Sequence, residues 1–267
     1  MRILTWNLWG RNEPWQARRD AITATLADVE PDVCGLQEVW QADGHNLAAD
    51  LAERLGMQCH FVMASLPDRA GGAVPIGNAV LSRWPIVERT QLRLPTGDSP
   101  DGRVVAHARI DAPGGALPVF TTHLTYRPGG SQIRLEQVRL LAGHVAGHAA
   151  ADDAYPPVVT GDLNAEPDSD EIRLLGGVHT APAAPGLVLL DAWRYADPAD
   201  PGFTWDLRNP YQAGSLIPSS RIDYVLVGLP RQGRGRVTSV RLAGTAPVDG
   251  AWPSDHFAVV ADLARPR

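Results

Sequence analysis

The chain has 267 residues, of which 44% are hydrophobic and 20% are charged, and it carries a formal net charge of −6. These values are typical of a globular protein that buries a sizeable core. An acidic chain is not suited to strong, sequence-independent binding of duplex nucleic acid. No apolar run approaches the length of a membrane-spanning helix, so we expect no stable membrane insertion.

The start of the chain, MRILTWN, has a strand-like pattern and lacks the apolar centre of a signal peptide. It favours a cytoplasmic location, with the alternative that a signal peptide has been trimmed from the sequence. Neither a low-complexity linker nor a shift in composition interrupts the chain. We therefore expect one domain over residues 1–267, and we expect a monomer.

Hydrophobic periodicity and turn residues predict strands with single helices between them. In chain order, we expect a strand at Met1–Leu8, a helix at Arg18–Val29, a strand at Asp32–Val39, a helix at Asn46–Leu55, and strands at Gln58–Met63, Asn78–Ser82, Ile86–Leu94, Val104–Ile110 and Leu117–Thr122. There follow a helix at Ser131–Ala146, a strand at Val158–Gly161, a helix at Asp168–Leu175, a strand at Leu187–Leu190, and strands at Arg221–Val227, Val237–Leu242 and Phe257–Asp262. Loops are expected at Leu66–Gly77, Pro95–Gly102, Ala181–Gly186 and Ala192–Ser220. This order suits packed sheets with helices outside them.

The segment Val158–Pro167, VVTGDLNAEP, joins a buried strand to two polar residues, Asp162 and Asn164. On an extended backbone, residues two positions apart face the same way. The carboxylate can orient a water or take its proton, and the amide can hold the oxygen that carries charge. The alternative is an Asx turn that Pro167 closes.

Several other predicted strands end in polar residues that an ordinary strand would not choose. Each one alone has a structural explanation as a turn, a cap or a satisfied core residue. Together they are hard to explain in this way, because each buried ionisable group is costly unless it is paired or bound to metal. We therefore expect the strand ends to meet at one crevice around a cation. The residues are Asn7, Glu38, His123, Asp162 with Asn164, Asp223, and Asp255 with His256.

The residue types indicate the metal. Oxygen donors predominate in Asn7, Glu38 and Asp255, with Asp162 nearby, and no Cys/His spacing typical of zinc occurs. Hard oxygen ligands favour Mg²⁺, with Mn²⁺ as a substitute. Such a site with acid–base histidines matches the needs of phosphoester hydrolysis, in which water attacks phosphorus in line.

Seven short motifs occur in one order along nearly the whole chain. They are TWN (Thr5–Asn7), LQEV (Leu36–Val39), GNAVLSR (Gly77–Arg83), THL (Thr122–Leu124), GDLN (Gly161–Asn164), RIDYVLV (Arg221–Val227) and SDHF (Ser254–Phe257). In these motifs the chain resembles the endonuclease/exonuclease/phosphatase superfamily. The resemblance implies an α/β fold, a deoxyribonuclease I-like four-layer α/β sandwich of two packed mixed β-sheets flanked by helices.

The resemblance also implies roles for the motif residues. Glu38 would bind the metal directly, with Asn7 and Asp255 contributing. Asp162 would orient or deprotonate the attacking water, and Asn164 would hold the nucleophile or a phosphate oxygen. The remaining catalytic residues would be His256, paired with Asp223, and His123 as a second phosphate-binding or acid histidine. Substrate contacts are expected from Asn78, Arg127, Trp205 and Arg221.

The function expected is therefore that of a Mg²⁺-dependent phosphoesterase, and more narrowly a phosphodiesterase. Trp9 stands where the abasic-site endonucleases of the superfamily carry an acidic or amide residue, and His123 is also foreign to that branch. The substrate stays open between a nucleic acid and a small-molecule or lipid headgroup. The alternative is a catalytically silent binding protein on the same fold, which the loss of a residue such as Glu38 or His256 would have favoured.

Overall fold

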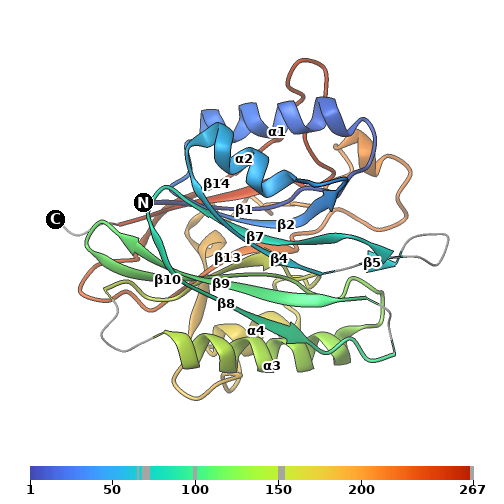
Figure 1. Cartoon of the computed structure of the whole chain (residues 1–267). Helices are drawn as coiled ribbons and strands as arrows, with labels where there is room; N and C mark the ends of the chain where they lie inside the picture. The colour runs from blue at the N-terminus through green and yellow to red at the C-terminus, as the bar shows by residue number, and fades with distance from the viewer. Residues whose placement is uncertain (65, 68–72, 99–100, 150–153, 265–267) are drawn as a thin grey trace.

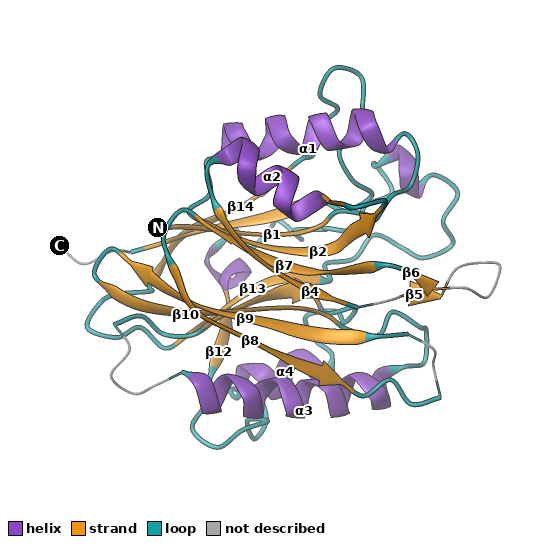
Figure 2. Cartoon of the chain, in the orientation of Figure 1, coloured by secondary structure: helices purple, strands orange, loops and turns teal. Residues whose placement is uncertain are grey.

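Two β-sheets pack face to face, and helices cover the outer face of each (Figures 1 and 2). The computed structural model describes residues 1–64, 66–67, 73–98, 101–149 and 154–264. The four-layer α/β sandwich expected from the sequence is confirmed. Among the residues described, no helix combines the length and the hydropathy needed to cross a bilayer.

The first sheet has the strand order β14-β15-β1-β2-β7-β4, and the short β3 pairs with β2. Its strands are β1 (Arg2–Asn7), β2 (Val33–Ala42), β3 (His45–Asn46), β4 (Gln58–Met63), β7 (Ile76–Ser82), β14 (Val237–Ala243) and β15 (Ala258–Leu263). The helices α1 (Trp15–Val29) and α2 (Leu47–Leu55) lie on its outer face. Apolar side chains of both helices and of the sheet form one buried cluster there, so this face is closed.

The second sheet has the strand order β12-β13-β11-β10-β9-β8. Its strands are β8 (Ile86–Leu94), β9 (Arg103–Ala112), β10 (Gly115–His123), β11 (Val158–Asp162), β12 (Leu189–Asp191) and β13 (Asp223–Gly228). The helices α3 (Ser131–His148) and α4 (Asp170–Gly176) cover its outer face (Figure 1). A second apolar cluster fills the space between these helices and the sheet.

The inner faces of the two sheets touch closely at Gly35 of β2. A Cβ atom at this position would lie 1.9 Å from Thr160 Oγ1 of β11, so only glycine leaves room for the opposite sheet. Next to it, Gln37 Nε2 donates to Thr121 Oγ1 of β10 at 2.8 Å and ties the sheets together. The wider interface between the sheets is a third apolar cluster with side chains from both.

Two predicted loops contain short elements. The expected loop Leu66–Gly77 includes the two-residue strands β5 (Leu66–Pro67) and β6 (Ala73–Val74), which pair with each other. The long loop Ala192–Ser220 contains the 3₁₀ helices η1 (Ala192–Tyr195) and η2 (Pro210–Gln212). Asp191 and Asn209 cap them, since each side chain accepts a hydrogen bond from a backbone N–H two residues later.

Candidate active site

Strand register places three predicted residues in one row across neighbouring strands of the second sheet, at the ends of these strands. His123 pairs with Asp162 across the parallel strands β10 and β11. Asp162 pairs in turn with Asp223 across the antiparallel strands β11 and β13. The C-terminal ends of β10 and β11 and the N-terminal end of β13 lie side by side, so residues that are far apart in the sequence become neighbours.

The first sheet contributes residues from β1, β2 and the segment before β15. Asn7 ends β1, and the β2–β7 register is interrupted between Leu36 and Val39, so a β-bulge holds Glu38. Glu38 has a φ of 51°, a left-handed conformation that redirects its side chain out of the strand alternation. As a result Glu38 Oε1 lies 3.3 Å from Asn7 Nδ2 and 3.8 Å from His123 Nδ1.

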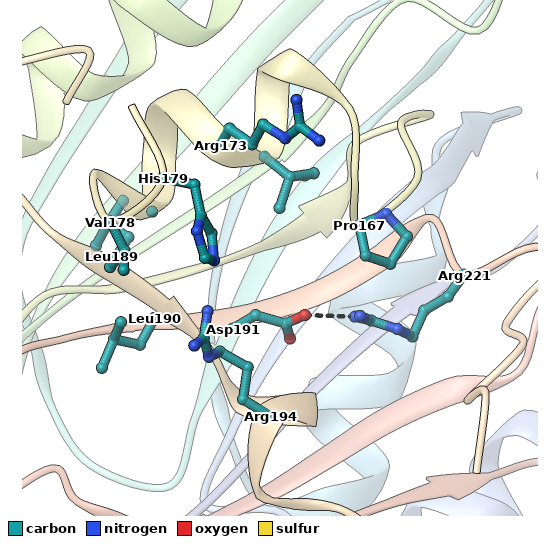
Figure 3. Close-up of a pocket in the computed structure, with 11 residues that line it drawn as sticks. Pro167, Arg173, Val178, His179, Leu189, Leu190, Asp191, Arg194 and Arg221 are labelled. Carbon is teal, nitrogen blue, oxygen red and sulfur yellow. Dashed lines mark hydrogen bonds and ion pairs between the residues drawn. The ribbon is translucent and has the colours of Figure 1, made fainter. Parts of the chain in front are cut away.

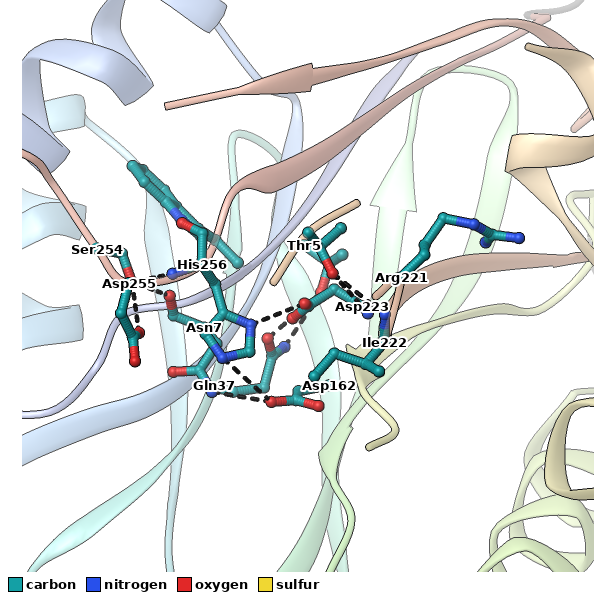
Figure 4. A network of polar contacts seen from close by, with 12 residues as sticks. Thr5, Asn7, Gln37, Asp162, Arg221, Ile222, Asp223, Ser254, Asp255 and His256 are labelled. Atoms are coloured by element: carbon teal, nitrogen blue, oxygen red, sulfur yellow. Dashed lines mark hydrogen bonds and ion pairs between the residues drawn. The ribbon is translucent and has the colours of Figure 1, made fainter. Parts of the chain in front are cut away.

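Asp162 contacts side chains from several segments, and Figure 4 shows its carboxylate beside Asn7 and His256. Its Oδ2 accepts a hydrogen bond from Asn7 Nδ2 at 3.0 Å, and it lies 3.5 Å from His123 Nε2 and 3.8 Å from His256 Nε2. Its Oδ1 accepts from the backbone N–H of Asn164 at 3.0 Å. One carboxylate of the second sheet is therefore within reach of three side chains, of which Asn7 comes from β1 of the first sheet and His256 from the segment before β15.

His256 and Asp223 form a buried ion pair. His256 Nδ1 lies 2.8 Å from Asp223 Oδ2, and both side chains are almost completely inaccessible to solvent. Burial disfavours the imidazolium, but the carboxylates of Asp223, Asp255 and Asp162 outweigh it and raise the pKa of His256 well above its ordinary value. His256 is therefore a cation at neutral pH.

His123 has the opposite protonation state. Burial lowers its pKa well below the ordinary value, and the charges of Arg103 and His256 add to that effect. At neutral pH it is therefore an uncharged imidazole that can donate one hydrogen bond and accept another. Two histidines with pKa values moved in opposite directions are typical of a catalytic site.

The carboxylates of the cluster match a hard divalent cation. Burial raises the pKa of Asp162 to about 7 and that of Asp255 to about 7, and the neighbouring carboxylates Asp223 and Glu38 contribute to these shifts. In the part of the chain that the structure describes, Asp223 Oδ1 has no hydrogen-bond partner. A cation would compensate this excess of buried negative charge with the oxygen donors it prefers.

Asn7 is placed beside the carboxylates, but its amide is already engaged. Its Oδ1 accepts a hydrogen bond from Trp9 N at 3.0 Å, while its Nδ2 faces Glu38 and Asp162. The amide would have to turn over before its oxygen could bind a metal. Glu38 and Asp255 are thus the better candidates for a metal, and Asn7 holds the carboxylates as a donor.

The long loop before β13 supports the cluster with residues that the sequence did not single out. Thr204 Oγ1 accepts hydrogen bonds from the backbone N–H groups of Ile222 and Asp223, each at 3.2 Å. Gln212 Nε2 donates to Asp255 Oδ2 at 3.1 Å. No local pattern marks these two residues, because their partners lie elsewhere in the sequence.

Two buried arginines were also missed. Arg18 of α1 donates to the backbone carbonyls of Leu8, Gly10, Asn12 and Pro253, and it thereby fixes the loop after β1 against the segment before β15. Arg103 of β9 pairs with Asp101, with 3.4 Å between Nη2 and Oδ2. Burial lowers the pKa of Arg103, although the charges of Asp101, Glu38 and Asp162 oppose the shift. Because a guanidinium keeps its charge in proteins, Arg103 still places a cation close to the cluster.

The residues predicted to contact the substrate differ in whether they border the cluster around Asp162. Trp205 lies edge-on against His256, with 5.2 Å between ring centroids, so it borders the cluster. Asn164, which was predicted as a catalytic residue and not as a substrate contact, donates through Nδ2 to Leu124 O at 3.2 Å. Asn78 is buried and donates to Val104 O at 2.9 Å, and Arg127 is half-exposed with its Nη2 4.0 Å from Asp101 Oδ1.

Arg221 does not join the cluster. Its Nη1 donates to Asp191 Oδ2 at 2.6 Å, and its side chain points away from Asp223 (Figure 4). Together with Arg173 and Arg194 it lines a separate cavity of about 140 Å³ beside α4 (Figure 3). The motif RIDYVLV led us to expect Arg221 at the phosphate. However, β13 begins only at Asp223, and the side chain of Arg221 lies before the strand and pairs with Asp191.

A model of the Endonuclease/Exonuclease/phosphatase family matches residues 4–256 of the chain. A "Probable RNA exonuclease" of Schizosaccharomyces pombe is 27% identical over 161 residues, which are 57% of this chain and 31% of that protein. A "Putative neutral sphingomyelinase" of Drosophila melanogaster is 25% identical over 190 residues, which are 66% of this chain and 41% of that protein. The chain thus spans less than half the length of both relatives.

The fold has close counterparts among solved structures. The structure of D. rerio TDP2 complexed with a single-strand DNA product superposes with a TM-score of 0.77 and covers 99% of both chains. The two sequences are 20% identical, so this likeness establishes the fold alone.

Proposed function

The chain belongs to the endonuclease/exonuclease/phosphatase family, and we propose that it is a divalent-metal-dependent phosphodiesterase. The observation that carries the proposal is the cluster around Asp162, where a carboxylate that titrates near neutrality faces one neutral and one cationic histidine. Phosphoester hydrolysis needs a base for water and positive charge for the phosphoryl oxygens. This cluster supplies both.

Asp162 is the residue that acts on the attacking water. Since burial raises its pKa to about 7, a large fraction is ionised at neutral pH and is basic enough to accept a proton. The backbone N–H of Asn164 and the amide of Asn7 each hold one of its oxygens, so the carboxylate is oriented before substrate binds.

His256 and His123 would contact the phosphoryl group. His256 is a cation held by Asp223 at 2.8 Å, so it can stabilise the negative charge that develops on the phosphoryl oxygens. Its Nε2 points toward Asp162 Oδ2, where the water would be held. His123 is neutral and donates a single N–H, which suits a phosphoryl oxygen without adding a second buried charge.

Glu38 and Asp255 would hold the cation, with Asn7 keeping Glu38 in place. A bound Mg²⁺, or Mn²⁺ in its place, would neutralise charge on the phosphate. The preference for Mg²⁺ rests on the oxygen donors, since zinc sites are richer in sulfur and imidazole.

The rings beside the cluster support a proposal for the substrate class. Trp205 borders His256, and the side chain of Tyr126 stands over Arg103, with 5.6 Å between guanidinium and ring centroid. Rings and a cation next to a phosphate site suit an unpaired base or a choline headgroup. Because one relative is named an RNA exonuclease and the TDP2 structure holds a single-strand DNA product, a single-stranded nucleic acid is the first substrate to test. A phosphocholine ester is the second, because another relative is named a sphingomyelinase.

The test is hydrolysis by the purified chain with Mg²⁺, with Mn²⁺ and with EDTA. The substrates are bis-p-nitrophenyl phosphate, p-nitrophenyl phosphate, single-stranded DNA and RNA, and sphingomyelin. We expect metal-dependent cleavage of a diester that Asp162→Asn reduces by at least about 10³-fold. The exposed Asp168→Asn carries the same substitution close by and should keep full activity. Turnover that persists in EDTA, or that Asp162→Asn leaves unchanged, would contradict the proposal.

A further inference from the structure

A second polar cluster lies beneath α3, on the helix-covered outer face of the second sheet. His107 of β9 is fully buried, and His144 and His148 lie one turn apart on α3. The ring centroids are 4.8 Å apart for His107 and His148, and 4.1 Å apart for His144 and His148. Strand alternation separates this cluster from the candidate active site, because the neighbours Ala106 and Ala108 face the interior between the sheets.

The hydrogen bonds of these histidines leave their Nε2 atoms available. His148 Nδ1 lies 3.0 Å from His144 O, and since a carbonyl only accepts, Nδ1 carries the proton and Nε2 carries a lone pair. His107 Nδ1 is held by Thr90 Oγ1 at 2.9 Å. Within the described part of the chain, neither His107 Nε2 nor His144 Nε2 has a hydrogen-bond partner.

Buried ring nitrogens without a hydrogen-bond partner are destabilising in an apolar layer, so a ligand that satisfies them is favoured. Phe120 stacks on His107 with 4.4 Å between centroids, so water has little room beside that ring. Burial, together with the charges of the neighbouring histidines, lowers the pKa of His107 to about 3 and that of His144 to about 4. These two rings are neutral at physiological pH, which is the form that binds metal.

We propose that His107, His144 and His148 bind one divalent transition-metal ion of the zinc class. One ring nitrogen from each residue lies within 4.8 Å of the others. A tetrahedral zinc ion with nitrogen ligands needs these atoms about 3.3 Å apart, so binding would draw the three rings closer together. Imidazole ligands without a carboxylate favour Zn²⁺, Co²⁺ or Ni²⁺ over Mg²⁺.

The Thr90 hydroxyl and the His144 carbonyl would act as outer hydrogen-bond partners that fix the orientation of two ligand rings. The ion would fasten α3 to β9, since two ligands come from the helix and one comes from the strand. A water would complete the fourth position, because His144 and His148 are only partly buried. The site is thus structural and is independent of the proposed phosphodiesterase activity.

The test measures metal directly and uses Zn²⁺ and Co²⁺ as probes. The full chain is dialysed against each metal with excess Mg²⁺ present to occupy the oxygen-rich site, and bound metal is then counted. We expect one equivalent of Zn²⁺, and with Co²⁺ the visible absorption of a tetrahedral complex. His144→Ala lies on a partly exposed helix face and favours helix formation, so it should fold and lower Zn²⁺ affinity by at least about 100-fold.

His148→Ala should give the same loss, and it serves as a second variant if His144→Ala proves unstable. The exposed His45→Ala outside the cluster should keep the full equivalent. Zn²⁺ should also raise the melting temperature of the unmodified chain and leave that of His144→Ala unchanged. Equal Zn²⁺ content and equal Co²⁺ spectra in the folded variants and the unmodified chain would overturn the proposal, and so would the absence of Zn²⁺ from both.

Discussion

Asp223→Asn isolates the contribution of the buried His256–Asp223 pair. The substitution keeps the shape of the side chain and removes the charge that lies 2.8 Å from His256 Nδ1. A hydrogen bond between charged groups contributes about 1.5–3 kcal/mol, and each pKa unit corresponds to about 1.4 kcal/mol. The pKa of His256 should therefore fall by about one to two units, and the rate of diester hydrolysis at neutral pH should fall by about 10²–10³-fold.

The pair also predicts how stability depends on pH. Because the folded state raises the pKa of His256, the stabilisation is complete below the unfolded pKa of about 6.5 and is lost as pH rises through the folded pKa. Asp223→Asn should thus lower the free energy of unfolding by about 3–5 kcal/mol at about pH 6, and by less at about pH 9. Urea denaturation at both pH values, with Asp168→Asn as control, measures this difference. A variant with unchanged hydrolysis and a pH-independent loss of stability would refute the reasoning.

Three further predictions concern the sheet interface, the buried arginine and the metal. Gly35→Ala places a methyl group 1.9 Å from Thr160 Oγ1, so urea denaturation should show a loss of about 3 kcal/mol or more, and a loss below about 1 kcal/mol would contradict the close contact. Arg18→Met removes the donor to four backbone carbonyls, and thermal unfolding should show a loss of about 3 kcal/mol, whereas an unchanged melting temperature would count against this role. Burial raises the pKa of Asp255 to about 7, so Mg²⁺ should raise the melting temperature more at about pH 8 than at about pH 5.5, and equal shifts would contradict Asp255 as a ligand.

The sequence predicted the regular elements well where the signal is local. The strands expected at Gln58–Met63 and Ile86–Leu94 coincide with β4 and β8, because apolar patterning and turn residues bound both segments. The helix expected at Asn46–Leu55 forms with Asn46 as its N-cap and Gly56 in a left-handed C-cap. These features depend on neighbours in the chain, which a sequence displays directly.

The least local feature predicted from the sequence is that the polar residues at the strand ends lie together. Residues such as Asn7, Asp162 and His256 lie together, although the motifs alone could not give their distances. The direction of the Glu38 side chain depends on a β-bulge that strand alternation does not predict. The metal dependence and the role of each residue stay predictions.

The parts that the sequence did not predict depend on contacts between distant segments. Gln212 and Thr204 lie in a stretch expected only as loop, and their importance comes from the site residues they hold. Arg221 was expected at the phosphate because of its motif, yet the carboxylate of Asp191 offers a closer buried partner. The three histidines near α3 escaped notice because His107 is far from the other two in sequence.

The most direct test of the proposed metal-dependent hydrolysis is the rate as a function of Mg²⁺ concentration, for the unmodified chain and for Glu38→Gln. The variant keeps the size of the side chain and removes the charge that would hold the cation next to Asp162 and His123. The Mg²⁺ concentration for half-maximal rate should rise by more than about tenfold, with partial recovery at high Mg²⁺. An identical Mg²⁺ dependence in both proteins would contradict a catalytic metal at this cluster.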